Sequence, residues 1–143
     1  MKIVIASGYF NPLHTGHLSY LQEARLLGDE LIVIVNNDRQ VNIKGRKLFM
    51  NEKDREMLIL NLKCVTNTWL SLSNDESISY DLYELRKFYS NDELIFAKGG
   101  DRNIDNIPQS ERDTCLKYNI KVVSNVGCEK LTSSSEILKR VQE

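Results

Sequence analysis

Cysteine, proline and histidine are scarce in this chain of 143 residues, and each scarcity narrows the possible classes of protein. The three cysteines, Cys64, Cys115 and Cys128, are odd in number and widely spaced, which excludes a complete disulfide framework and matches no zinc-binding pattern. The two prolines and seven glycines argue against long disordered linkers. We therefore expect reduced thiols and a single domain that covers residues 1–143.

The chain also has no excess of either charge and no long apolar run. Nineteen lysines and arginines balance twenty acidic residues, whereas proteins that bind nucleic acids or membrane surfaces need a basic face. The apolar run in the opening MKIVIASGYF is too short for a signal peptide, and no stretch approaches membrane-spanning length. These features predict a cytoplasmic protein with neither nucleic acid nor membrane as its partner.

Apolar runs alternate with helical patterns along the whole chain. Strands are predicted at 2–7, 30–38, 65–73, 93–101 and 120–126, and helices at 16–29, 51–63, 78–89, 108–119 and 133–143. Residues 42–50 form a polar, basic loop between the second strand and the next helix. This order predicts an α/β fold, a Rossmann-like doubly wound five-stranded parallel sheet with helices on both faces. Ligands of such sheets bind beyond the carboxyl ends of the strands.

The segment after the first strand, GYFNPLHTGH (8–17), contains the only two histidines of the chain, His14 and His17. Gly8 permits a close approach of the backbone, Pro12 fixes a turn, and Gly16 leaves room beside the following helix. The unpaired amides at the start of a helix favour a phosphate, and two imidazoles could add donors to it. The alternatives are a helix cap, a packed side chain or half of a metal site, although no third histidine exists to complete one.

The same segment resembles the HxGH signature of the cytidylyltransferase-like nucleotidyltransferases. The resemblance continues through YLQEARLLGDELIVIVNND (20–38), KGGD (98–101) and SSSEIL (133–138), so it covers nearly the whole chain. It implies an enzyme in which a substrate phosphate oxygen attacks the α-phosphate of a nucleoside triphosphate and pyrophosphate leaves. In such a reaction the protein contributes mainly positioning and stabilisation of charge.

The resemblance implies catalytic roles for His14, His17 and Lys47 at the nucleotide phosphates. It implies substrate contacts for Asn11 and Asp38, although the family commonly has aspartate where this chain has Asn11. An amide cannot supply the charge of a carboxylate, so that contact is the one in question. The remaining residues expected to bind the nucleotide are Gly8, Tyr9, Phe10, Thr15, Gly16, Lys44, Arg55, Gly99, Gly100, Asp101, Ser133, Ser134 and Ser135.

Several of these motifs also have ordinary structural interpretations. The six lysines and arginines between residues 39 and 55 could form a solvated face, but a triphosphate and a phosphorylated substrate together need cations, for which Lys44 and Lys47 are favoured. A glycine turn before an aspartate is common in loops, and a serine run before EIL can be a capping box. Mg²⁺ is the implied cofactor, carried by triphosphate chemistry without a protein cage of its own.

The sequence leaves the substrates open between related alternatives. The resemblance favours a member that acts on a sugar phosphate, because the glycerol-3-phosphate cytidylyltransferases usually carry an arginine before their last motif and NVGCEKLT (125–132) has none. The nucleotide is ATP or CTP. A nucleotide-binding sensor without turnover is a further alternative, prompted by Asn11. The family resemblance also implies a homodimer.

Overall fold

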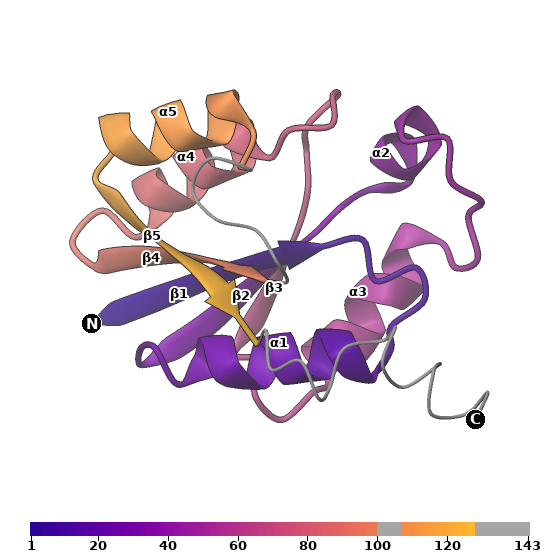
Figure 1. Cartoon of the computed structure of the whole chain (residues 1–143), viewed down its shortest axis with the longest axis horizontal. Helices are drawn as coiled ribbons and strands as arrows, with labels where there is room; N and C mark the ends of the chain where they lie inside the picture. The colour runs from indigo at the N-terminus through magenta and orange to yellow at the C-terminus, as the bar shows by residue number, and fades with distance from the viewer. Residues whose placement is uncertain (100–106, 128–143) are drawn as a thin grey trace.

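In a computed structural model, which describes residues 1–99 and 107–127, five parallel strands form one sheet with helices on both faces (Figure 1). The strands are β1 (Lys2–Gly8), β2 (Glu30–Val35), β3 (Asn67–Leu70), β4 (Glu93–Gly99) and β5 (Ile120–Val126). The helices are α1 (Thr15–Arg25), α2 (Asp38–Ile43), α3 (Glu52–Leu60), α4 (Ser79–Phe88) and α5 (Gln109–Lys117). The predicted fold class is confirmed.

The strand order is β3-β2-β1-β4-β5, with every neighbouring pair parallel. The chain therefore builds outward from β1 to β3 and then returns to the other side of β1 for β4. This reversal creates a crevice at the carboxyl ends of β1 and β4, where doubly wound sheets bind their ligands. The connection from β1 to α1 starts at this crevice.

Alternate residues of the central strands supply two separate cores. Val4, Ala6 and Ala97 share one core with residues of α1 and α3, whereas Ile5 and Phe96 share the other with residues of α4 and α5. The two pairs of helices lie on opposite faces of the sheet (Figure 1). Both faces of β1 are thus buried, which explains why its sequence is a continuous apolar run rather than an alternating one. Of the helices that the structure describes, none is long and apolar enough to span a membrane.

The structure differs from the sequence prediction at several ends of elements. β2 ends at Val35 rather than at 38, because Asn37 caps the short helix α2, which the sequence analysis placed partly in the strand and partly in the loop. The Asn37 side chain accepts from the Gln40 amide, and Gln40 Oε1 accepts from the Asn37 amide. β3 covers only 67–70, and α1 ends at Arg25, before Gly28. The predicted helix at 133–143 lies outside the described residues.

Candidate nucleotide-binding site

The connection between β1 and α1 has an unusual backbone that places Phe10 beneath the histidines. Phe10 has a φ of +50°, a left-handed conformation that is rare for a bulky residue, and its side chain is 1% exposed. Its ring occupies the space above Gly8, where a Cβ would lie 2.8 Å from Phe10 Cζ. It also meets the His17 ring edge-on at 5.1 Å. Phe10 therefore supports His17 from the core instead of lining the pocket, and Gly8 makes room for this ring rather than for a ligand.

His14 and His17 stack on each other at the start of α1. Their ring centroids are 3.7 Å apart with an interplanar angle of 22°. His14 is the N-cap, and its Nδ1 accepts from the Gly16 amide at 3.1 Å. His17 Nδ1 in turn accepts from the His14 amide at 3.2 Å. The structure thus brings together the two histidines that the sequence singled out, but the amide of Gly16, expected to be unpaired and to face a phosphate, is used by His14.

These hydrogen bonds determine the tautomer of both rings. A nitrogen that accepts a hydrogen bond carries no proton, so each neutral ring has its proton on Nε2. The pKa of His17 is lowered from 6.5 to about 4, first by burial and second by the neighbouring His14. His17 is therefore a neutral Nε2–H donor at neutral pH. The helix start presents imidazole donors together with the positive end of the helix dipole.

The lowered pKa of His17 predicts a dependence of stability on pH. The unfolded chain binds this proton as the pH falls below about 6.5, whereas the folded protein binds it only near pH 4, so the free energy of unfolding decreases across this range. We expect the wild type to lose roughly 2–4 °C more in Tm than His17→Gln between pH 7 and pH 4.5, measured by circular dichroism. An equal decrease in Tm in the wild type and in His17→Gln would contradict this prediction.

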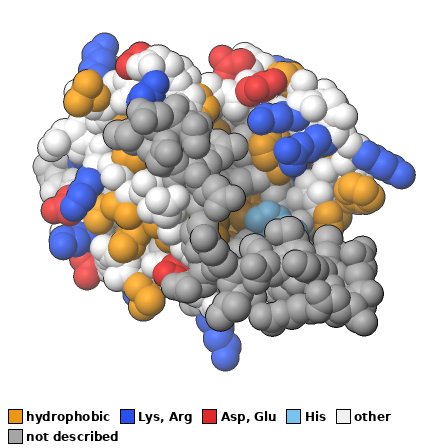
Figure 2. All heavy atoms as spheres, viewed as in Figure 1, with side chains coloured by type: hydrophobic (Ala, Val, Ile, Leu, Met, Phe, Trp, Pro, Cys, Tyr) orange, Lys and Arg blue, Asp and Glu red, His pale blue; other side chains and the backbone are white. Residues whose placement is uncertain are grey.

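The loop after α2 carries three exposed cations, each beside an aromatic ring. Lys44 Nζ lies 5.8 Å and Arg46 Cζ 5.6 Å from the centroid of the Tyr9 ring, and Lys47 Nζ lies 5.6 Å from that of Phe49. Figure 2 shows the histidine side chains in a hollow, with lysine and arginine side chains gathered to one side of it. Arg46 was missed by the sequence analysis, although its position between two selected lysines was a usable signal.

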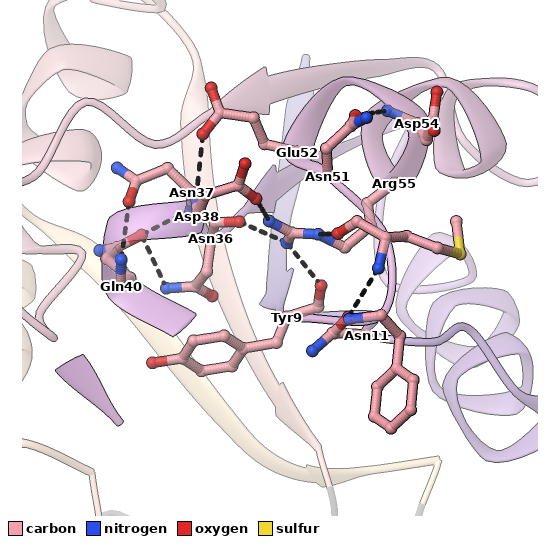
Figure 3. Close-up of polar contacts among 12 residues, drawn as sticks. Tyr9, Asn11, Asn36, Asn37, Asp38, Gln40, Asn51, Glu52, Asp54 and Arg55 are labelled. Carbon is pink, nitrogen blue, oxygen red and sulfur yellow. Dashed lines mark hydrogen bonds and ion pairs between the residues drawn. The ribbon is translucent and has the colours of Figure 1, made fainter. Parts of the chain in front are cut away.

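Arg55 has a different place from the one expected. Its side chain is fully buried, and its guanidinium donates to the carbonyls of Met50, Tyr9 and Asn36 and to the Asp38 carboxylate at 2.7 Å (Figure 3). These bonds use its donors inside the protein, so Arg55 is not positioned to contact a nucleotide phosphate. Asp38, expected to bind substrate, is the ion-pair partner of Arg55. The pair joins the ends of β1 and β2 to α3.

Asn11 also faces the protein rather than a substrate. Its side-chain amide donates to the Lys47 carbonyl at 2.7 Å and accepts from the amides of Phe49 at 2.8 Å and Met50 at 3.2 Å. All three partners belong to the second half of the basic loop of residues 42–50. The departure from the expected aspartate therefore coincides with a position where both the donor and the acceptor of an amide are used.

The end of β4 is packed against α1. A Cβ on Gly99 would lie 2.8 Å from Tyr20 Cδ1, so this glycine admits the Tyr20 ring rather than a ribose or base. The Tyr20 hydroxyl donates to the Ala97 carbonyl and accepts from the Ser7 amide at 3.2 Å, which ties α1 to β1 and β4. Thr15, also expected at the nucleotide site, is the first residue of α1. The remaining expected residues lie outside the described residues: Gly100, Asp101, Ser133, Ser134 and Ser135.

Within residues 1–99 and 107–127, no three side chains of histidine, cysteine, aspartate or glutamate come together as a group able to hold a metal ion. The carboxylate of Asp38 is engaged by Arg55. The donors around the histidines are N–H groups and cations, which suit anionic oxygens. These groups suit the oxygens of a triphosphate, which would themselves hold any Mg²⁺ that the reaction uses.

Comparison with known proteins assigns the chain to a family. The family model described as Cytidylyltransferase-like matches residues 5–140. The FAD synthase of Picrophilus torridus is 33% identical over 145 residues, which cover 100% of this chain and 97% of that protein. The bifunctional protein HldE of Pasteurella multocida is 34% identical over 145 residues, which cover 99% of this chain but 28% of HldE.

A solved structure agrees in fold as well as in sequence. The lipopolysaccharide core biosynthesis protein from Thermoplasma volcanium GSS1 has a TM-score of 0.66 and 31% identity, covering 87% of this chain and 96% of that one. The family match spans nearly the whole chain, and FAD synthase and HldE are nucleotidyltransferases. The chain therefore belongs to the cytidylyltransferase-like family and is a nucleotidyltransferase.

Proposed function

We propose that the protein transfers an adenylyl group from ATP to the phosphate of a sugar phosphate and releases pyrophosphate. The observation that carries this proposal is the stacked imidazole pair, whose Nδ1 atoms are occupied by backbone amides at the start of α1. Each neutral ring consequently has its N–H on Nε2, a type of donor that suits anionic oxygens at the crevice of the sheet. Such fixed donors stabilise charge that develops in a transition state without any need to reorient.

The reaction needs no general base from the protein. A phosphate monoester has a second pKa near 6, so its oxygen is already an anionic nucleophile at neutral pH. This oxygen forms a bond to the α-phosphorus, the bond from that phosphorus to the bridging oxygen breaks, and pyrophosphate takes the electron pair. His14 and His17 donate to the oxygens of the crowded α-phosphate. The protein contributes alignment and charge stabilisation.

The exposed cations of the loop complement the substrates in charge. Lys44, Arg46 and Lys47 lie beside Tyr9 and Phe49, which limits the directions that the long side chains can take. We assign to them the phosphates of the triphosphate and of the acceptor, whose negative charges repel each other as they approach. Mg²⁺ bound to the triphosphate would neutralise the charge of the departing pyrophosphate.

The choice of substrates is supported by the relatives. The adenylyltransferase activity associated with HldE and the lipopolysaccharide core protein favour ATP and a sugar phosphate. A second candidate acceptor is FMN, because the FAD synthase of Picrophilus torridus matches the chain over 97% of its own length. The glycerol 3-phosphate and sensor alternatives make different predictions in the same experiment.

The test is pyrophosphate release from each of the four nucleoside triphosphates, with hexose and heptose 1-phosphates, FMN and glycerol 3-phosphate as acceptors. We expect release with ATP and a sugar 1-phosphate, at least about a hundredfold faster than with CTP, since a site built to hydrogen-bond one base rejects a base that leaves its groups unpaired. Release with FMN alone would replace the first candidate with the second. Release only with CTP and glycerol 3-phosphate, or binding without release, would overturn the proposal.

A further inference from the structure

Asn11 connects two parts of the site that are far apart in sequence. It lies in the turn before the histidines, and its side chain bonds three backbone groups of residues 47–50. The preceding stretch is held elsewhere, since the Arg46 amide donates to the Val41 carbonyl at 3.3 Å. The following stretch is held by Arg55, whose Nε donates to the Met50 carbonyl at 3.0 Å. Asn11 fixes the part between these two anchors, where Lys47 lies.

We propose that Asn11 is a positioning residue for the transfer reaction, which holds Lys47 at a set distance from the imidazole pair. This inference rests on the proposed function. Lys47 and its neighbours in the loop are exposed, so no packing core determines where the Lys47 backbone lies. Asn11 follows the buried Phe10 directly, and its own backbone is therefore fixed relative to the ring that supports His17.

An amide is the chemical group that this position requires. The nitrogen of Asn11 donates to one carbonyl, and its oxygen accepts from two amides. In Asn11→Asp the carboxylate keeps the acceptor for Phe49 and Met50 but places an anionic oxygen where the structure has a donor 2.7 Å from the Lys47 carbonyl. In Asn11→Ala all three bonds are lost. Both variants should free the loop, the alanine variant more completely.

Trypsin measures this anchoring without any assay of activity, because it cleaves after Lys44, Arg46 and Lys47 when the loop opens. We expect cleavage in this loop, located by mass spectrometry, to be about tenfold faster in Asn11→Ala than in the wild type. Asn51→Ala is the matched control. At the start of α3 the Asp54 amide donates to Asn51 Oδ1 at 2.9 Å. The Asn51→Ala variant removes this one hydrogen bond and leaves the anchors of residues 47–50 in place. Equal cleavage rates in the wild type and Asn11→Ala would overturn the anchoring.

A double-mutant cycle tests whether Asn11 acts through Lys47. When Asn11→Ala is introduced into the wild type, we expect kcat/KM for pyrophosphate release to fall by roughly tenfold to a hundredfold. When it is introduced into the Lys47→Ala variant, the further fall should be less than about threefold. Asn51→Ala should change kcat/KM by less than about threefold. Additive losses of Asn11→Ala and Lys47→Ala would overturn the positioning role. If the wild type releases no pyrophosphate with any pair of substrates, the proposed function is refuted. The anchoring is tested separately, by the rate at which trypsin cleaves the loop.

Discussion

Replacement of His17 with alanine is expected to lower kcat by about 10²–10³-fold, the usual cost of removing one donor aimed at developing transition-state charge. The reason is the fixed Nε2–H that His17 presents once its Nδ1 accepts from the His14 amide. The measurement is the steady-state rate of pyrophosphate release at saturating substrates. If KM rises in the variant while kcat is unchanged, His17 contributes to binding but not to stabilisation specific to the transition state.

The matched control is His17→Gln, because glutamine at the third position of a helix can keep the acceptor for the backbone amide of the N-cap. This variant should melt within about 2 °C of the wild type at pH 7, since it preserves the cap. It should nevertheless be as slow as His17→Ala, because it lacks the imidazole. If His17→Gln turns over at the rate of the wild type, the ring serves only as a helix cap and the assigned role is wrong.

Replacement of Arg55 with methionine is expected to cause the largest loss of stability, about 3–5 kcal/mol in the free energy of unfolding. The side chain is fully buried, and its removal leaves the Asp38 carboxylate and the carbonyls of Tyr9, Asn36 and Met50 without their donor. Urea denaturation followed by circular dichroism measures the change. Activity per folded molecule should fall as well, because the ends of β1 and β2 are no longer joined.

Two control variants test whether the loss of stability in Arg55→Met comes from the buried guanidinium. Lys53→Met changes an exposed cation on the same helix and should alter stability by less than about 0.5 kcal/mol. Asp38→Asn should cost less than Arg55→Met, because Arg55 keeps its three carbonyl partners. Should Arg55→Met remain stable and instead lose affinity for the nucleotide, the guanidinium would be a phosphate ligand, as the sequence alone suggested.

The sheet was predictable mainly because its central strands, β1, β2 and β4, are buried on both faces. The run 120–126 corresponds to β5, the runs 30–38, 65–73 and 93–101 contain β2, β3 and β4, and β1 extends one residue beyond the run 2–7. Parallel strands between two layers of helices read as continuous apolar sequence. The helix α2 was not predicted, because it has six mostly polar residues and too few apolar positions to show a period. Its signal was the pair Asn37 and Gln40, which caps it, rather than any hydrophobic pattern.

The histidines of the site were visible in the sequence, but the partners of Arg55 and Asn11 were not. His14 and His17 are the only histidines, and they lie where the connection after an apolar strand enters the next helix. Arg55, in contrast, lies in a run of charged residues that resembles an exposed surface, and it is buried because three backbone carbonyls converge on it. A sequence does not reveal where backbone carbonyls will lie. Neither the burial of Arg55 nor the hydrogen bonds of Asn11 could therefore be derived from it.

The two kinds of group that we propose bind the phosphates should respond differently to ionic strength. A neutral N–H donor such as that of His17 has no net charge for dissolved ions to screen, and the pKa of about 4 keeps it uncharged. The exposed ammonium and guanidinium groups of residues 44–47 are fully open to counterions, whose screening length is ~8 Å in physiological salt. We therefore expect added salt to weaken the contributions of the exposed cations more than the contribution of the neutral His17 donor.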